Sequence, residues 1–338
     1  MPAETELSTD YMGLRLPSPL VASAGPLSQS VDQMKELEES GVGAIVMFSL
    51  FEEQLRHEEA RLVEAAEEHA DSFAEALSFF PTPPSNELGE TGNYLSLLER
   101  GANALSVPLI ASLNGARSGG WTTTARRMQD AGAAAIELNV YFVPGDLSMS
   151  GAEVEERHLE ILQAVKDVVS VPVAVKLSPY FSNLGRMAGG LDEAGADALV
   201  LFNRFLQPDI DIHRKGVVSG FELSRPDEGR LPRTWLAVLH GRVGASLAAT
   251  SGVETSADVI KALLAGADVV MTTSALIRHG AGYAAELVDG LRRYLGRNRL
   301  SLARARGMLA VPSDAPIDEY ERSGYVSALE KAKRRYGV

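Results

Sequence analysis

The amino-acid sequence predicts an α/β protein built as a (β/α)8 TIM barrel, a closed sheet of eight parallel strands surrounded by helices. Four similar phrases, each a helix end, a glycine and a short apolar run, begin at Ser40, Ala131, Ala194 and Ala265. Glycine ends a helix at little cost in the left-handed conformation, and a short apolar run suits a strand covered on both faces. A second type of apolar run, twice opened by Val-Pro, alternates with these phrases, which is the rhythm of a barrel. The expected strands are Pro19–Ser23, Ile45–Phe48, Leu109–Asn114, Ile136–Asn139, Val173–Leu177, Leu199–Asn203, Ser246–Thr250 and Val270–Thr273.

One domain is expected to span residues 1–338, because 45% hydrophobic content in a chain of this length can form one large core. Two insertions, at about 52–92 and 204–232, follow the second and sixth strands. We expect both to lie over the barrel mouth, because the carboxyl ends of barrel strands carry the active site. Within the first insertion, the Glu- and Ala-rich stretch 52–75 predicts a helix.

The composition excludes several classes of function. A formal net charge of -13 argues against general binding to nucleic acid or to anionic membranes. The chain has no cysteine, which excludes disulfides, thiolate metal sites, a cysteine nucleophile and an iron–sulfur cluster held by this chain's own thiolates. The N-terminus does not resemble a leader and no run of about 18 apolar residues occurs, which predicts a soluble cytoplasmic protein with no membrane partner. A small-molecule substrate is expected, while a homodimer and a redox partner protein remain open.

Polar residues gather at the carboxyl ends of the expected strands, where a packed barrel needs none for stability. They are Ser23, Ser49, Asn114, Asn139, Lys176, Asn203, Thr250, Ser251, Thr272, Thr273 and Ser274. Each alone could be a turn former. Together, their amide, hydroxyl and ammonium groups indicate a concave binding site with few formal charges.

Lys176 stands in an apolar strand, where an ammonium group requires an anionic partner. A reduced flavin ring, a phosphate or a Schiff base with a substrate carbonyl would each explain it. The structural alternative is an ion pair with Glu137 of the fourth strand.

The last two strands predict a phosphate site. Thr250–Val253 and Thr272–Ser274 are small, hydroxyl-bearing turns directly before helices. Backbone N–H groups at such turns can hold a dianion. The pattern indicates a phosphate-bearing ligand without distinguishing a flavin from a sugar phosphate.

Several segments carry a family resemblance. The stretch Thr250–Thr255, followed by Ala265–Asp268 and Thr273–Leu276, resembles the flavin phosphate segment of dihydroorotate dehydrogenases. Pro19–Gly25 is similar to that family's first FMN-contacting turn, and Val175–Phe181 to its flavin-contacting lysine segment. The sequence Glu-Leu-Asn at 137–139 resembles the segment whose asparagine contacts both flavin and orotate.

The resemblance covers most of the chain and implies an FMN cofactor. The residues that it assigns to FMN binding are Ala24, Gly25, Ser49, Asn114, Asn139, Lys176, Asn203, Thr250, Ser251, Gly252, Thr273 and Ser274. It also implies an FMN-dependent oxidoreductase of pyrimidine biosynthesis that converts dihydroorotate to orotate, or a related oxidation or reduction between neighbouring carbons.

The chain departs from the family pattern at the substrate side. After Asn139 the family continues with a hydrophobic residue, Ser, a Cys or Ser base, Pro and Asn, whereas this chain reads Val-Tyr-Phe-Val-Pro-Gly-Asp. The family's Lys-Ser at the end of the second strand is Phe48-Ser49 here, and the orotate-reading loop is not recognisable in 83–94. Residues 227–232 also differ, because they replace the family's Gly-rich phosphate loop.

Tyr141 is the candidate for the missing proton-transfer residue, alongside Asn139 and Lys176 in the catalytic group. It follows Asn139 by two residues and would point the same way along a strand. A phenol serves more readily as general acid than as base near neutrality, since its ordinary pKa is about 10. The alternative role of Tyr141 is a lid aromatic. Arg204 is the candidate for a substrate carboxylate clamp, with a loop salt bridge as its alternative.

Two other functions stay open from the sequence. One is a barrel lyase or aldolase that uses Lys176 as a Schiff base, and the other is a non-catalytic flavin subunit that serves electron transfer or regulation. No dinucleotide fingerprint or metal-ligand spacing is present, and His57 and His158 lie in charged helical segments that predict solvated faces.

Overall fold

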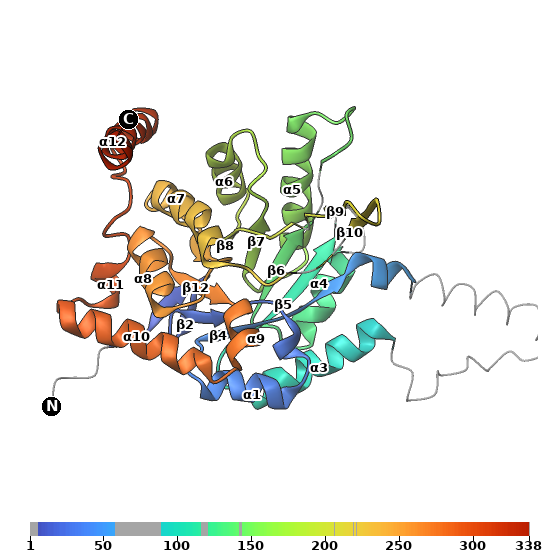
Figure 1. The fold of residues 1–338 in the computed structure, drawn as a ribbon. Coiled ribbons are helices and arrows are strands. Elements are labelled where there is room, and N and C mark those ends of the chain that lie inside the picture. The colour runs from blue at the N-terminus through green and yellow to red at the C-terminus, as the bar shows by residue number, and fades with distance from the viewer. Residues whose placement is uncertain are drawn as a thin grey trace, which may run out of the picture.

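The computed structural model describes residues 6–57, 89–115, 121–141, 144–205, 207–218, 220 and 222–337. Its centre is a closed barrel of eight parallel strands with helices around it (Figure 1). The barrel strands are β3 (Leu20–Ala22), β4 (Ala44–Phe51), β5 (Leu109–Gly115), β6 (Ala135–Val140), β7 (Val173–Leu177), β8 (Ala198–Leu201), β11 (Ser246–Ala249) and β12 (Val269–Thr272). Each neighbours the next around the barrel, and β12 returns to β3, so the predicted fold is confirmed.

The four repeated phrases end their helices as predicted. Gly41, Gly132, Gly195 and Gly266 have φ of 91°, 95°, 89° and 121°, respectively. This left-handed region is open to glycine and costly for residues that carry a Cβ. Each glycine therefore turns the chain from a surface helix into the buried strand that follows.

The third and fourth phrases also contain an aspartate that fastens neighbouring strands. Asp197 Oδ2 accepts hydrogen bonds from the backbone N–H of Val173 at 2.7 Å and from Lys166 Nζ at 2.7 Å. Asp268 Oδ2 accepts the backbone N–H of Leu247 at 2.7 Å. In both copies the carboxylate satisfies a backbone donor at the start of the preceding barrel strand, where the parallel ladder leaves it unpaired.

The helices lie outside the barrel. The described helices are η1 (Pro26–Ser28), α1 (Val31–Glu39), α3 (Glu90–Ala104), α4 (Trp121–Asp130), α5 (Gly151–Lys166), α6 (Leu184–Glu193), η2 (Pro226–Gly229), α7 (Arg230–Leu239), α8 (Ser256–Ala265), α9 (Ser274–His279), α10 (Tyr283–Asn298), α11 (Leu302–Ala305) and α12 (Ile317–Tyr336). Those that pack on the barrel, such as α5 and α10, bury one apolar face. Figure 1 shows α12 standing away from the ring of helices, beyond α11. Within the described ranges, no helix has the length and apolar character that crossing a membrane requires.

Alternation along the strands divides the core into two parts. In β6, Ile136 and Leu138 pack with the surrounding helices, whereas Ala135 packs with residues inside the barrel. Glu137 and Asn139 share the alternation of Ala135 and therefore face inward. The strand that builds the barrel wall thus also delivers two polar groups to its interior.

A hairpin formed by β1 (Thr9–Tyr11) and β2 (Leu14–Leu16) closes one end of the barrel. Tyr11 and Leu16 are fully buried in the cluster inside the barrel. The backbone N–H of Met12 donates to Ser246 Oγ at 3.1 Å, at the amino end of β11. The hairpin therefore lies at the amino ends of the strands, opposite the mouth.

The two predicted insertions are described unequally. Residues 52–57 are helical, in line with the predicted helix, and most of the rest of 52–92 lies outside the described residues. The second insertion forms an antiparallel hairpin of β9 (Asp209–Asp211) and β10 (Gly216–Val218), then η2. Organisation as a single domain stays a prediction.

His158 contradicts the predicted solvated position, while His57 is exposed as expected. His158 is 2% exposed on the face of α5 that packs inward, because it follows Val154 at the four-residue spacing of a helix face. Its ring lies 5.1 Å from that of Phe181, edge to face, and Nδ1 is 2.7 Å from the Val154 carbonyl. The charged residues around it in the sequence hide this spacing. Burial lowers the pKa of His158 below its ordinary value.

The buried His158 predicts acid sensitivity. Because its pKa is lower in the folded protein, the unfolded chain binds this proton more tightly, so protonation favours unfolding. The free energy of unfolding should fall as pH drops below about 6.5. In His158→Gln this part of the pH dependence should be missing when urea unfolding is measured between pH 7.5 and 5. Parallel pH profiles for the two proteins would contradict the assignment.

Candidate active site

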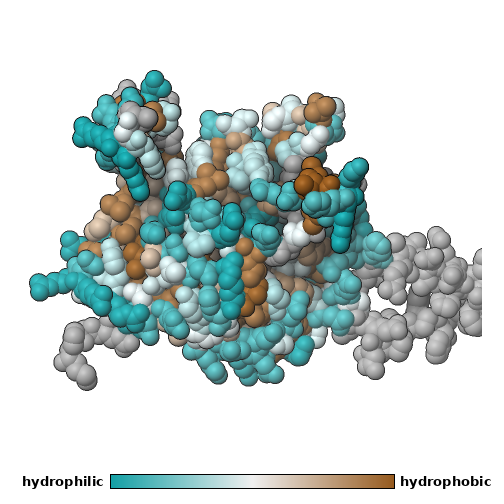
Figure 2. Space-filling view, in the orientation of Figure 1, coloured by the Kyte–Doolittle hydropathy of each residue, from teal (hydrophilic) through white to brown (hydrophobic). Residues whose placement is uncertain are grey.

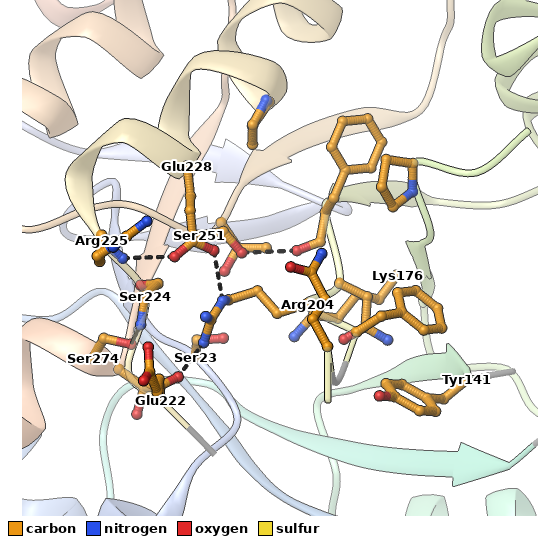
Figure 3. A pocket seen from close by; sticks show the side chains of 18 of the residues that line it. Ser23, Tyr141, Lys176, Arg204, Glu222, Ser224, Arg225, Glu228, Ser251 and Ser274 are labelled. Atoms are coloured by element: carbon orange, nitrogen blue, oxygen red, sulfur yellow. Dashed lines mark hydrogen bonds and ion pairs between the residues drawn. The ribbon is translucent and has the colours of Figure 1, made fainter. Parts of the chain in front are cut away.

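The carboxyl ends of the barrel strands surround a cavity of about 1500 Å³. Fourteen of the predicted site residues line it, namely Ser23, Ala24, Ser49, Asn114, Asn139, Tyr141, Lys176, Asn203, Arg204, Thr250, Ser251, Thr272, Thr273 and Ser274. Gly25 and Gly252 do not line it, and instead let neighbouring loops approach closely behind it. Figure 3 shows Ser224, Arg225 and Ser274 at one end of the group of lining side chains and Lys176 and Tyr141 at the other.

Lys176 and Glu137 form a buried ion pair at the floor of the cavity. Lys176 Nζ lies 3.6 Å from Glu137 Oε1, and the two residues are 8% and 1% exposed. The predicted structural alternative is therefore present. The contact is too long for a hydrogen bond, and both carboxylate oxygens of Glu137 lack a hydrogen-bond partner among the described residues. Lys176 also lines the cavity, so its ammonium group can pair with Glu137 and a ligand at once.

Two phenols lie buried near Glu137. The hydroxyl of Tyr94 accepts the backbone N–H of Ser112 at 3.0 Å, and Ser112 Oγ lies 2.9 Å from Ser49 Oγ. Burial, followed by the charge of Glu137, raises the pKa values of both Tyr94 and Tyr11 above the ordinary range. Both phenols are therefore neutral.

A β-bulge directs Ser49 into the barrel. The register between β4 and β5 shifts between Val46 and Ser49, and Val46 itself faces the interior. Strict alternation from Val46 would turn Ser49 outward, and the extra residue reverses this. Ser49 then pairs in register with Ser112.

Two asparagines form an amide pair beside Lys176. Asn139 lies in register with Lys176 on the neighbouring strand, and Asn203 Nδ2 donates a hydrogen bond to Asn139 Oδ1. The backbone N–H of Asn203 donates to the Leu177 carbonyl at 2.7 Å, which continues the ladder past the end of β8. The pair leaves the Asn139 amide donor and the Asn203 carbonyl oxygen for a ligand.

The turn after β11 has the geometry expected of an anion site. Ser251 and Gly252 have φ of 71° and 69°, and consecutive left-handed residues direct backbone N–H groups toward one side. Ser251 Oγ donates to the Phe202 carbonyl at 3.1 Å, which fixes the turn against the neighbouring strand end. A Cβ on Gly252 would stand 2.2 Å from the backbone nitrogen of Gly229, so the second insertion packs directly on this turn.

The turns after β3 and β12 approach each other just as closely. A Cβ on Gly25 would lie 2.4 Å from Thr273 Oγ1, so a larger residue would collide there. Ser274 Oγ accepts the backbone N–H of Ser224 at 3.1 Å, and Arg278 Nη2 donates to the Ser224 carbonyl at 2.7 Å. Hydroxyls and backbone donors from four segments therefore converge at this end of the cavity.

Arg204 is engaged within the second insertion. Its Nε lies 2.7 Å from Glu228 Oε2, and Nη1 donates to the Glu222 carbonyl (Figure 3). The loop salt bridge considered from the sequence is thus formed. The carboxylate clamp stays a prediction.

Sequence reasoning missed most of what the second insertion adds to the cavity, and the aromatic residues at the strand ends. The missed lining residues include Phe51, Tyr180, Phe205, Ile210, Val218, Glu222, Ser224, Arg225 and Glu228. Phe51 and Phe205 carry a signal that could have found them, because each lies two residues beyond a polar strand end. The residues of the second insertion carry no such signal in the sequence, since their positions depend on long-range packing. In the part of the chain that the structure describes, no group of three or more His, Asp or Glu could hold a metal ion.

A (β/α)8 barrel with a buried lysine and hydroxyl-rich turns after its last two strands defines a ligand-binding barrel of the enzyme type. The family model described as Dihydroorotate dehydrogenase matches residues 6–295. The chain therefore belongs to the dihydroorotate dehydrogenase family, a family of oxidoreductases, and the resemblance found in the sequence is confirmed.

Relatives cover nearly the same length. The protein named dihydroorotate dehydrogenase B (NAD(+)), catalytic subunit, of Methanocella arvoryzae is 29% identical over 302 residues, which cover 88% of this chain and 95% of that protein. The protein of the same name from Thermoplasma volcanium is 28% identical over 300 residues, covering 87% and 95%. A protein of Aeropyrum pernix, named as a candidate dihydroorotate dehydrogenase A (fumarate), is 28% identical over 303 residues, covering 87% and 94%.

The close approach at Gly252 predicts a position-specific loss of stability. Gly252→Ala places a Cβ against Gly229 at a left-handed residue, which should cost about 1–2 kcal/mol from φ alone and more from the collision. The melting temperature should fall. Gly189→Ala is the matched control, because Gly189 lies in α6 with open space around its Cβ position, and its melting temperature should stay the same or rise. Equal melting temperatures for the two variants would refute the packing role of Gly252.

Proposed function

We propose that this protein is an FMN-dependent oxidoreductase that transfers hydrogen between neighbouring carbons of a small cyclic or carboxylated substrate, as in the conversion of dihydroorotate to orotate. The observation that carries the proposal is the division of one cavity into two ends. Lys176, Asn139 and Asn203 meet at one end, and the turns at Ser251 and Ser274 lie at the other. A flavin ring joined to a phosphate has the same division.

The residues present fit FMN. The Ser251–Gly252 turn and Ser274 would hold the phosphate through backbone N–H and hydroxyl groups. Lys176 would face the pyrimidine part of the flavin, where its ammonium group matches the negative charge of the reduced ring. When bound, FMN supplies the hydride acceptor or donor that none of the side chains can provide.

Tyr141 is the proposed proton-transfer residue. The backbone N–H of Tyr141 donates to the Gly115 carbonyl at 2.9 Å, so the ladder continues beyond β6 and the side chain faces the same way as Asn139. Its ring stacks on Phe205 with centroids 4.5 Å apart and planes at 18°, which restricts the position of the hydroxyl. A phenol there would give its Oη proton to a substrate carbon during reduction of a double bond.

A redox partner protein is part of the proposal. Two relatives are named as catalytic subunits of an NAD(+) enzyme, a name that implies a further subunit. This chain has no cysteine to hold an iron–sulfur cluster, so electron transfer through a cluster would take place in the partner. A homodimer stays open as the assembly of this chain alone.

Flavin binding tests the proposal directly. The purified protein should be yellow and release FMN on denaturation. Lys176→Met combined with Glu137→Gln leaves no lone buried charge, and it should weaken FMN binding about tenfold to a hundredfold through loss of a charge-assisted contact. Lys331→Met on the exposed helix α12 is the control. A colourless protein that takes up no added FMN would overturn the proposal and favour a Schiff-base lyase, which borohydride trapping of Lys176 would detect.

The Tyr141 hydroxyl can be tested separately from flavin binding. Tyr141→Phe keeps the ring on Phe205 and should retain FMN, while anaerobic flavin bleaching by dihydroorotate or a related dihydro compound slows by about tenfold or more. Tyr325→Phe, which removes a hydroxyl from the exposed helix α12, is the control and should bleach at the wild-type rate. An unchanged rate in Tyr141→Phe rejects the role. A flavin that no such compound bleaches would favour the non-catalytic subunit instead.

A further inference from the structure

Aromatic side chains form a second layer at the barrel mouth, beyond the polar residues at the strand ends. Phe51, Tyr141 and Phe205 each lie two residues beyond a polar residue assigned to the cofactor, and Tyr180 lies four residues beyond Lys176. All four aromatic residues line the cavity. In β4 and at the end of β6, two residues along a strand means the same face and one step closer to the mouth. The aromatic side chains therefore border the space above the proposed flavin ring.

Phe205 contacts the rings of both Tyr141 and Tyr180. Phe205 stacks on Tyr141 as described, and its ring centroid lies 5.4 Å from that of Tyr180 at an angle of 58°. Phe51 and Tyr180 are nevertheless 45% and 51% exposed. Large apolar side chains that remain exposed around a cavity mark a surface that a ligand covers.

The β9–β10 hairpin adds aliphatic groups to the same cavity. Ile210 and Val218 line it and are 69% and 48% exposed. Figure 2 shows a group of hydrophobic side chains on the upper face near this hairpin. The rings at the ends of four barrel strands, β4, β6, β7 and β8, and the aliphatic hairpin therefore offer apolar contacts to one ligand.

The pairing of Arg204 disfavours a carboxylate on the substrate. Arg204, the candidate carboxylate clamp, is already paired with Glu228 at 2.7 Å. A substrate carboxylate would have to displace that pair before it could use the guanidinium group.

We propose that the site accepts an uncharged, planar ring compound with an apolar substituent, in place of a ring carboxylate such as orotate. The polar edge of the ring would hydrogen-bond with the Asn139 and Asn203 amides. The substituent would lie against Phe205 and the β9–β10 hairpin. This inference rests on the proposed flavin function and specifies its substrate class.

Ligand titration of the FMN-loaded protein tests the inference. The probes are orotate, uracil and 6-phenyluracil, which share one ring and differ in carrying a carboxylate, hydrogen or an apolar group. Binding is followed by the shift of the visible flavin spectrum and by calorimetry. We expect 6-phenyluracil to bind at least about tenfold more tightly than orotate, since aromatic contacts and apolar burial favour it.

Variants separate the aromatic contact from general effects. Phe205→Leu should reduce the preference for 6-phenyluracil to about threefold or less, while Tyr325→Leu on the exposed helix α12 leaves it unchanged. Flavin absorbance of each variant reports whether the cofactor site is intact. Orotate binding as tightly as 6-phenyluracil, or an unchanged preference in Phe205→Leu, would overturn the inference and leave the flavin proposal standing. A protein that binds no FMN would instead overturn the proposed function.

Discussion

Lys176 and Glu137 are buried together inside the barrel, with Nζ and Oε1 3.6 Å apart. Taking either charge out of water costs several kcal/mol, so neither is tolerable at this depth without the other. The register of β6 that turns Glu137 inward also turns Asn139 inward, and β7 brings Lys176 level with Asn139. The polar floor of the cavity is therefore a consequence of how two adjacent strands align, and the turns and aromatic residues are arranged around it.

The barrel could be predicted because its signals are local. A glycine after a helix and a short apolar run after the glycine specify backbone conformation within a few residues, and Gly41 and Gly195 have the expected left-handed φ. The polar strand ends were equally readable, since parallel strands deliver their carboxyl ends to one mouth. Asn139 and Lys176 meet there for this reason.

Features that depend on long-range packing could not be read in the same way. The bulge in β4 that turns Ser49 inward leaves no local mark in the sequence. Arg204 pairs with Glu228, 24 residues away, so its availability depends on how the insertion folds back. His158 was misjudged because charged neighbours conceal its place on the packed face of α5. In each case the competing influence is tertiary contact rather than local preference.

The β1–β2 hairpin has a kinetic consequence for the proposed enzyme. Among the described residues, Tyr11 and Leu16 fill the amino end of the barrel, so small molecules reach the interior from the opposite side, through the mouth. The substrate that is oxidised and a small molecule that is reduced would then enter the cavity by the same route, and the first would leave before the second binds. Binding in this order gives double-displacement kinetics, which appear as parallel lines when reciprocal rate is plotted against reciprocal substrate concentration. An acceptor that takes electrons through a docked partner protein would not need to enter the cavity, so this order of binding would not apply to it.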